Sequence, residues 1–475
     1  MRLYPLHKKE GQKDAFLYEQ LIHFLKDDIL RGSLAAGERL PSKRQFATQL
    51  GVSIATVEKA YSELVDEGYL YAKPKSGYYV RALSSLPRLH PLAQEPRTPL
   101  RNAQRAAEQA PDWRFDLTSN ELPSASFPFS TWSKVLRQTI AEKKPALMTP
   151  VPMAGAPELR RAIAHHLADF RGLAVSPEQI VIGAGSEYLY ALLTRFFGKD
   201  TLFAIEDPGY GKMRRIYESC ETRTCTVPLD AGGICIEELR ASGASIAHTS
   251  PSHHFPTGLV MPVTRRYELL AWASGTPDRY ILEDDYDSEF RFTGRPLPTL
   301  MSIDAGSRVI YLNTFTKTLT PTIRISYLVL PSGLIEPFQE KLGFLACPVS
   351  TFEQYTLARF IEDGYFEKHL TRMRTLYRRK RDLFVRCLKK SALKNSAHII
   401  EQSSGLHFLL QIQNGRSETE LKRAFEAVRL RIHAISDYYA HPQRDAVPTF
   451  LINYSSLERA KIPEVVALLV KAASE

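Results

Sequence analysis

The sequence predicts two folded parts: a small helical domain with a β-hairpin, and a large α/β domain behind it. The chain has 475 residues, which is more than one ordinary domain holds. Apolar residues recur at helical spacing near the N-terminus, whereas β-rich runs alternate with helical stretches beyond Trp113. Between them, prolines at 87, 91, 96, 99 and 111 predict a partly extended spacer. The expected divisions are therefore 14–82, 83–113 and 114–475.

Composition narrows the class of protein. Hydrophobic residues make up 44% and charged residues 24%, which is typical of a globular chain. The net charge of +10 fits a polyanionic partner. The five cysteines are odd in number, scattered and without a CxxC pair, so we expect reduced thiols and no zinc site. No signal peptide or membrane-spanning run is visible, and a cytoplasmic location is expected.

Three helices and a hairpin are expected in the first part. Residues 17–29 carry leucine or isoleucine every four positions, which predicts an amphipathic helix. Ser42-Lys-Arg-Gln45 has the form of a capping box for a second helix ending at Leu50, where Gly51 suits a left-handed cap. Ser53 begins a third helix, and short strands are expected at 69–71 and 78–80. The third helix turns these residues inward: Val57, Ala60, Tyr61, Leu64 and Val65.

This order of elements is a winged helix-turn-helix, and double-stranded operator DNA is its expected partner. The third helix would enter the major groove, and the wing would reach the adjacent groove. Side chains at the start of the second helix would contact phosphates or a base edge. A small helical domain used for protein contacts is the alternative, although local placement of the basic residues favours DNA. The expected DNA contacts are Lys43, Arg44, Ser53, Thr56, Lys59, Lys75 and Gly77.

About sixty-five residues of this part resemble the GntR family of bacterial repressors. The resemblance rests on Gly37-Glu-Arg-Leu-Pro-Ser-Lys-Arg44, on Val52-Ser-Ile-Ala-Thr-Val-Glu-Lys-Ala-Tyr61 and on Glu67-Gly-Tyr69. It implies a DNA-binding regulator.

The second part is predicted to be α/β with a largely parallel sheet. Strands are expected at 179–182, 201–205, 280–282 and 308–312, and helices at 157–170, 187–197, 211–219 and 263–273. Residues from about 345 onward are expected to form a helix-rich terminal part. Ligands of such sheets bind beyond the carboxyl ends of the strands.

An amine, a carboxylate and a phenol follow two of these strands in the order that pyridoxal phosphate needs. Asp284 and Tyr286 are two residues apart and would lie on one face of the sheet. The carboxylate would pair with the pyridine nitrogen, and the phenol would face the phenolate oxygen. Lys317 would form the Schiff base.

Donors for the cofactor's phosphate are also present. Thr314 and Thr316 offer hydroxyls and amides, and Arg324 offers a fixed guanidinium. Gly185 and Ser186 stand between a strand and a helix, where amide donors are free.

The second part resembles fold-type I aminotransferases. The likeness rests on Gly155-Ala-Pro-Glu-Leu-Arg-Arg-Ala-Ile163, Glu206-Asp-Pro-Gly-Tyr210, Ser250-Pro-Ser-His-His-Phe-Pro-Thr-Gly258 and the cofactor residues above. The whole chain is similar to MocR/GabR-type regulators. That likeness implies a head-to-tail homodimer, with Tyr210 stacked on the cofactor ring and His253 close by. Phe255 stands where aminotransferases usually have an asparagine.

The resemblance also breaks where an aminotransferase holds its substrate. The carboxylate-clamping arginine is missing from Phe450-Leu-Ile-Asn-Tyr454. Lys212 and Asp437 depart from the pattern of the member that senses γ-aminobutyrate, so that amine is not the expected effector. Both are taken as effector-binding, although Asp437 has an equal alternative as a structural hydrogen-bonding group.

The predicted function is a pyridoxal-phosphate-dependent transcriptional regulator without physiological transaminase activity. It would sense an amino acid or a dipeptide such as D-alanyl-D-alanine by aldimine exchange at Lys317. A sensor of pyridoxal phosphate itself and a true aminotransferase fused to a DNA-binding module are the alternatives. Residues 371–390 hold nine Lys and Arg against one Asp, which predicts a solvated helix face or a second DNA contact.

Overall fold

The computed structural model describes residue 6 and residues 15–82, 112–119, 126–292, 297–400, 405–440 and 447–474. The chain forms two compact units, Met1–Ala110 and Pro111–Glu475. The expected spacer lies outside the described residues except for its last two, so its limits stay a prediction. No described helix has the length and apolar character that crossing a membrane requires.

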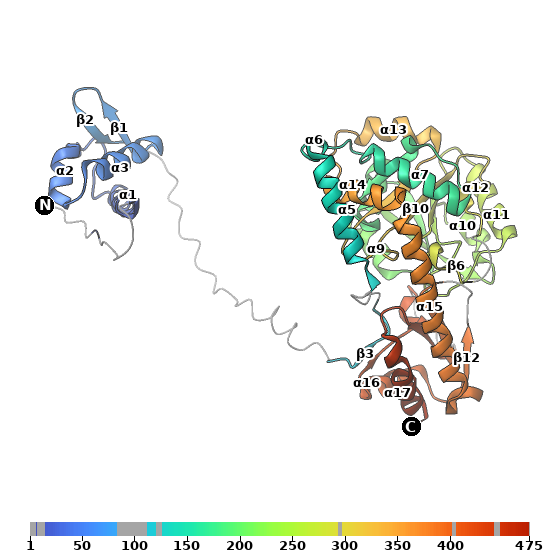
Figure 1. Cartoon of the computed structure of the whole chain (residues 1–475). Coiled ribbons are helices and arrows are strands. Elements are labelled where there is room, and N and C mark those ends of the chain that lie inside the picture. The colour runs from blue at the N-terminus through green and yellow to red at the C-terminus, as the bar shows by residue number, and fades with distance from the viewer. Residues whose placement is uncertain are drawn as a thin grey trace. The chain divides into compact units, whose positions relative to one another are not determined.

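The first unit is a three-helix bundle closed by an antiparallel hairpin, as the sequence predicts (Figure 1). Ser42 accepts a hydrogen bond from the Gln45 amide and starts the second helix, and Gly51 ends it with φ 65°. Ser53 caps the third helix in the same way. The elements are α1 (Ala15–Leu30), α2 (Lys43–Leu50), α3 (Ile54–Asp66), β1 (Leu70–Lys73) and β2 (Gly77–Val80).

An apolar core joins the helices of this unit to the hairpin. Val57, Leu64 and Leu70 are fully buried in it, together with Tyr61. The Tyr61 hydroxyl donates to the carbonyl of Pro41 at 3.0 Å, so its polar end is satisfied. Val65 is only partly buried, although the sequence predicts it inside.

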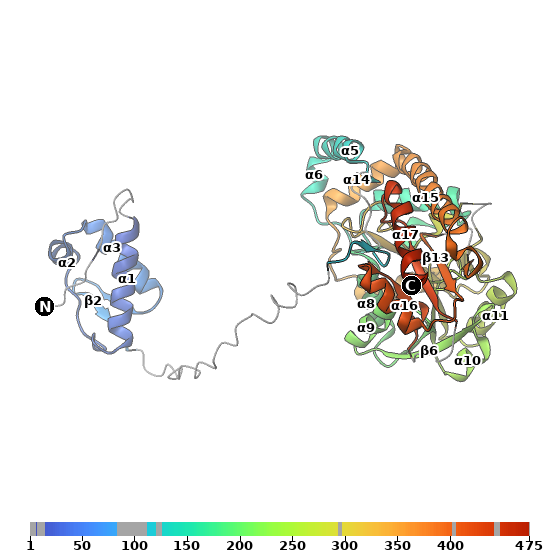
Figure 2. The same ribbon diagram turned by 90° about the horizontal axis from the view of Figure 1, so that it is seen from below.

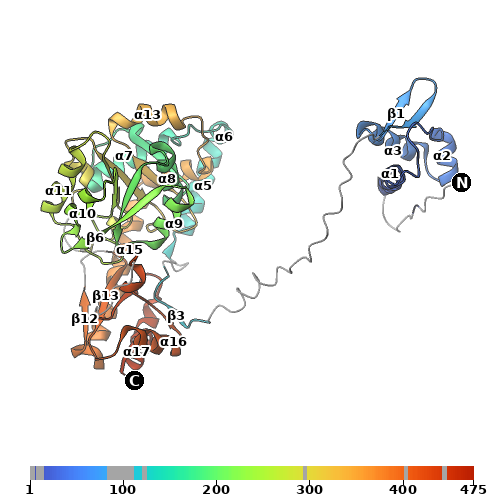
Figure 3. The ribbon, with the colours of Figure 1, turned by 180° about the vertical axis from the view of Figure 1, so that it is seen from behind.

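An eight-stranded sheet organises the second unit (Figure 3). Its four central pairings are parallel, whereas β11 and β7 run antiparallel to their neighbours. The prediction of a largely parallel sheet is confirmed. In spatial order the strands are β4 (Ile180–Gly183), β11 (Ser326–Val329), β10 (Val309–Thr314), β9 (Tyr280–Asp284), β8 (Ile246–Thr249), β5 (Leu202–Asp207), β6 (Arg223–Asp230) and β7 (Gly233–Ile234).

Helices cover the faces of this sheet and bury its apolar side chains. Residues of α7 and α14 pack on one face, against Ile180 and Tyr327, and residues of α8 and α13 pack on the other, against Val181 and Leu328. The helices are α5 (Phe129–Glu142), α6 (Lys144–Leu147), α7 (Pro157–Arg171), α8 (Ser186–Phe197), α9 (Gly211–Ser219), α10 (Ile236–Ala241), α11 (Val263–Ser274), α12 (Leu300–Ile303), α13 (Ser332–Leu342) and α14 (Thr351–Glu362).

The C-terminal part contains a second sheet as well as helices, so the expectation of a helix-rich end is incomplete (Figure 2). Its order is β12-β13-β16-β15, entirely antiparallel. The elements are α15 (Tyr365–Lys389), β12 (Ala397–Ile400), β13 (His407–Ile412), α16 (Glu418–Ala427), β15 (His433–Ala434), β16 (Thr449–Asn453) and α17 (Ile462–Ser474), while β14 (Leu430–Arg431) pairs with β3 (Phe115–Asp116).

Candidate cofactor site

A cavity of about 350 Å³ lies where the central strands of the large sheet end. Side chains that follow β5, β8, β9 and β10 meet there, as expected for the carboxyl edge of a parallel sheet. Eight of the ten predicted cofactor residues line it: Ser186, Tyr210, Asp284, Tyr286, Thr314, Thr316, Lys317 and Arg324. Gly185 and His253 lie directly behind this lining.

Asp284 ends β9 with one carboxylate oxygen free. Its Oδ2 atom accepts from the Tyr190 hydroxyl at 2.6 Å and lies 3.7 Å from Nε2 of His248. Its Oδ1 atom is buried without a hydrogen-bond partner among the described residues. A buried carboxylate oxygen without a partner is costly, so this atom marks a place where a donor on a ligand would fit.

The strand alternation turns the next carboxylate to the opposite side. Asp285 forms a fully buried ion pair with Arg171 at 2.8 Å and accepts from the Tyr311 hydroxyl at 2.7 Å. Burial disfavours the charged Arg171, but the nearby carboxylates outweigh this and raise its pKa. This ion pair holds the end of β9 in place on the side opposite to Asp284.

Lys317 follows β10 and points into the same cavity. Burial lowers the pKa of its amine to about 8, while the carboxylate of Asp287 opposes the shift. About one-tenth of an amine with this pKa is neutral at pH 7, far more than for an ordinary lysine, and the neutral form is the nucleophile.

A cradle beside Lys317 suits a phosphate group. Gly185 has φ 88°, and a Cβ atom there would lie 2.5 Å from Nη2 of Arg324, so only glycine lets the guanidinium approach. Ser186 begins α8, whose first amides face the cradle. The Thr314 hydroxyl donates to Thr316 at 2.8 Å and accepts from Ser326, so Thr314 positions Thr316.

Tyr286 is held by a histidine and an aspartate. Nδ1 of His253 lies 2.8 Å from Asp287 and 3.2 Å from the Tyr286 hydroxyl. The backbone of Gly405 closes over the imidazole: a Cβ atom on Gly405 would lie 1.9 Å from its ring. His253 therefore contacts the cavity through Tyr286 rather than lining it.

Aromatic rings form the wall opposite the cradle. Phe255 meets Tyr210 and Tyr438 edge to face, with ring centroids 5.9 and 5.2 Å apart. His407 completes the wall 5.5 Å from Phe255, and burial holds its pKa well below the ordinary value. Of these rings, Tyr210, Phe255 and His407 line the cavity, and Phe255 places an apolar ring there in place of an amide.

A second carboxyl group lines the floor. Glu206 accepts from the Ser250 amide at 3.1 Å and from the Thr249 hydroxyl. Burial raises the pKa of Glu206 to about 7 and lowers the pKa of His254, 3.5 Å away, to about 3. The two groups therefore face each other with a neutral imidazole near pH 7.

The two expected effector contacts are engaged elsewhere. Asp437 accepts from Lys422 at 2.7 Å and from the Ala434 amide at 2.9 Å, and it does not line the cavity. These contacts favour the structural hydrogen bond over the effector contact, which stays a prediction. Lys212 pairs with Glu187, which also lies 3.8 Å from Arg324, so it reaches the cavity only through that carboxylate.

Several lining residues escaped the sequence prediction. Glu206 and His254 lie within two of the aminotransferase-like motifs described above, so those motifs could have identified them as site residues. Tyr190, Asp287 and His407 carry no local pattern, because their place depends on how helix, loop and C-terminal sheet pack.

Some of the predicted DNA contacts are exposed in the first unit, whereas others are engaged with neighbouring side chains. Arg44 is exposed, and Lys43 pairs with Glu58 of α3. Ser53 is exposed but caps α3. The outward placement of Thr56 is wrong: it is buried, and its hydroxyl bonds to Ser53 at 2.7 Å.

The remaining three contacts lie on the surface. Lys59 is exposed with its amine 3.7 Å from the Tyr18 ring centroid. Lys75, at φ 60°, stands at the tip of the hairpin, and Gly77 lies beside the guanidinium of Arg39. Arg39 is therefore a basic wing residue that the sequence prediction omitted.

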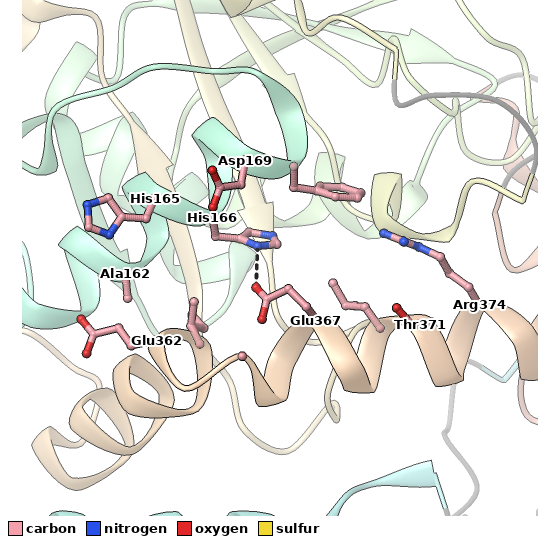
Figure 4. A pocket seen from close by; sticks show the side chains of 12 residues that line it. Ala162, His165, His166, Asp169, Glu362, Glu367, Thr371 and Arg374 are labelled. Atoms are coloured by element: carbon pink, nitrogen blue, oxygen red, sulfur yellow. Dashed lines mark ion pairs between the residues drawn. The ribbon is translucent and has the colours of Figure 1, made fainter.

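A second cavity of about 460 Å³ opens between α7 and the junction of α14 with α15 (Figure 4). His166 faces Glu367 across it at 3.4 Å, and Arg374 lies at one end. Asp169 and Glu362 add acidic charge to its rim. It contains none of the predicted site residues.

Two family models match the chain, one in each of the two units. Residues 17–80 match the gntR family of bacterial regulatory proteins, and residues 114–444 match aminotransferase class I and II. The fold and the site thus define a gntR-type DNA-binding domain joined to an aminotransferase-like domain.

Curated relatives share this arrangement over nearly their full length. The chain is 36% identical over 465 residues to the uncharacterized HTH-type transcriptional regulator YdeL of Bacillus subtilis, covering 97% of each chain. It is 32% identical to the probable rhizopine catabolism regulatory protein MocR of Rhizobium meliloti, covering 91% of this chain and 90% of that one. The chain belongs to the MocR-type HTH transcriptional regulators.

Solved structures resemble the second unit in fold. A Pyrococcus horikoshii kynurenine aminotransferase matches with a TM-score of 0.67 at 24% identity, covering 79% of this chain and 94% of that one. The class I and II aminotransferase fold implies dependence on pyridoxal phosphate. The residues present fit that group: a free buried carboxylate oxygen on Asp284, a glycine cradle at Gly185 and the amine of Lys317 share one site.

Proposed function

We propose that this regulator senses an amino compound through pyridoxal phosphate held at Lys317. The supporting observation is that Lys317, with its lowered pKa, shares one cavity with the unpartnered carboxylate oxygen of Asp284. Asp284 would hold the pyridine nitrogen, and Arg324 with the start of α8 would hold the phosphate. Tyr286, oriented by His253, would face the phenolate oxygen.

Bound pyridoxal phosphate supplies an aldehyde that exchanges one amine for another. The chain's own contribution would be to present the Lys317 amine in a partly neutral form and to hold the ring with Asp284 and Tyr210. An incoming amine that displaced Lys317 would release this side chain into the cavity. We propose that this release, transmitted to the DNA-binding unit, is the signal.

The arginine with which an aminotransferase holds the substrate carboxylate is missing from β16, and this supports sensing rather than catalytic turnover. β16 (Thr449–Asn453) contains no arginine. The two Lys and Arg side chains among the described residues that line the cavity, Lys317 and Arg324, are assigned here to the cofactor, so the α-carboxylate of an amino acid would lack the fixed orientation that proton removal at Cα needs.

A gauge of vitamin B6 is the second candidate. It is favoured by a relative, the HTH-type pyridoxine biosynthesis transcriptional regulator PdxR of Corynebacterium glutamicum, 35% identical over 364 residues and covering 77% of each chain. In that case occupancy of the site by pyridoxal phosphate would itself change DNA affinity.

One titration separates these functions. Full-length protein loaded with pyridoxal phosphate is mixed with amino acids and dipeptides, including D-alanyl-D-alanine. The visible spectrum and the affinity for duplexes selected from random sequence are recorded together. A compound that changes both is the effector, whereas a DNA affinity that follows the cofactor alone indicates the B6 gauge. Steady release of a keto acid would overturn sensing in favour of transamination.

The pH dependence of cofactor capture tests the state of Lys317. Because only the neutral amine attacks, the capture rate of cofactor-free protein should rise about tenfold per pH unit below its pKa and level off above about pH 8. Stopped-flow absorbance measures this rate. Nα-acetyl-lysine, whose one amine has the ordinary side-chain pKa, is the reference, and its rate should keep rising to about pH 10. A protein rate that rises with it would contradict the lowered pKa.

A further inference from the structure

A row of basic side chains lies on the solvent side of α15 and continues into the turn after it. All are exposed, and none has an ion-pair partner in the part of the chain that the structure describes. We call this set the basic face: Arg378, Arg379, Arg386, Lys389, Lys390 and Lys394.

The other Lys and Arg side chains of residues 371–390 form hydrogen bonds or an ion pair within the second unit. The Lys380 ammonium is buried and donates to the Ser455 carbonyl at 2.7 Å, and Arg374 donates to the Glu289 carbonyl at 2.6 Å. Arg372 donates to the Ser126 carbonyl at 2.7 Å. Arg381 pairs with Asp382 at 2.8 Å. The structure thus divides the run into anchoring side chains and a free basic face.

Apolar packing on the opposite side makes this face rigid. Met373, Tyr377, Phe384 and Leu388 are buried against the C-terminal sheet and helices at helical spacing. The helix is visible along the outside of the second unit (Figure 1). At 1.5 Å per residue, Arg378 and Lys390 stand about 18 Å apart along its axis. That length corresponds to roughly five base pairs of duplex.

Neighbouring acids leave the face positive. Asp382 lies on the same side of α15 and pairs with Arg381. Glu458 faces the buried Lys380, and Glu464 pairs with Arg114 and Lys461. Glu367, at the other end of α15, lies by the second cavity. The uncompensated charge is therefore concentrated on the C-terminal half of α15.

We infer that the basic face is a second DNA-contact surface, which binds the phosphate backbone of duplex DNA beside the site read by the winged helix. The inference rests on the DNA-binding part of the proposed function. Several guanidinium and ammonium groups on a fixed helix match regularly spaced phosphates. Contacts with phosphate oxygens carry no sequence information, so the contribution of this face is sequence-independent.

Full-length protein and a random-sequence duplex several helical turns long provide the test. The variant is Arg378→Gln/Arg379→Gln/Arg386→Gln. Its matched control, Arg161→Gln/Lys199→Gln/Arg223→Gln, removes the same charge from exposed positions on separate elements. Binding is measured by fluorescence anisotropy over a series of salt concentrations. Circular dichroism melting and sedimentation velocity check folding and assembly.

Each lost phosphate contact should make the slope of log affinity against log salt less negative by about 0.9, so the α15 variant should change it by up to about 2.7. Its affinity at low salt should fall at least tenfold, whereas the control should stay near wild type. Equal slopes for variant and control would overturn the inference.

Other outcomes are also decisive. If Arg44→Gln weakens binding while the α15 variant keeps the wild-type slope, only this inference fails. If wild type binds neither the random-sequence duplex nor any duplex selected from random sequence, the proposed function fails with it. A change in sedimentation without a change in slope would assign the face to contact between copies of the chain, which also overturns it.

Discussion

Replacing Lys317 with alanine is expected to abolish covalent retention of pyridoxal phosphate. The variant should lose the visible absorbance of the bound cofactor after gel filtration, because the remaining contacts of Asp284 and Arg324 hold the ring only reversibly. Its DNA affinity should no longer respond to any amine that acts on wild type. The Lys317 side chain points into a cavity and belongs to none of the apolar core clusters of the second unit, so its truncation should leave the fold intact.

Borohydride reduction followed by peptide mass spectrometry identifies the attached residue directly. Wild type should carry the reduced cofactor on the peptide containing Lys317, and the variant should carry none there. Lys199→Ala, at an exposed position, is the control and should behave like wild type. A Lys317→Ala protein that keeps its amine response would refute the proposed mechanism of sensing.

Replacing Arg171 with methionine is expected to destabilise the second unit by about 3–5 kcal/mol. The substitution leaves Asp285 buried without its ion-pair partner, 2.8 Å away in wild type. The free energy of unfolding in urea, followed by tryptophan fluorescence, measures the loss. All three tryptophans (113, 132 and 272) belong to the second unit, so the signal reports that unit.

The double variant Arg171→Met/Asp285→Asn provides the control for this substitution. It removes both charges of the ion pair and should recover most of the lost stability, because position 285 no longer carries a buried charge without its partner. If the single and double variants are equally destabilised, packing of the arginine stem accounts for the loss and the ion pair does not.

The sequence predicted those elements in which apolar side chains recur at regular spacing. Leu159, Ile163 and Leu167 recur at helical spacing after Pro157, and α7 forms there. In contrast, β8 is only four residues long and includes His248 and Thr249. Its strand conformation comes from its parallel neighbours, β5 and β9, which the sequence of the segment does not show.

The same distinction applies to the site. Lys317, Asp284 and Tyr286 could be predicted because each follows a strand closely and meets a known chemical need. His407 could not, since its place depends on the register between β13 and β16. Thr56 was misplaced because its hydroxyl turns back to the Ser53 cap, a contact that helical periodicity does not predict.

The contact between Gly405 and His253 has a mechanical consequence. The main chain of the C-terminal part rests directly on an imidazole that also holds Tyr286. Close-packed groups cannot absorb a displacement of even a fraction of an ångström without passing it on. Any motion that moves Gly405 away from His253 should therefore shift the Tyr286 phenol, so a movement of the C-terminal part would change the lining of the cavity.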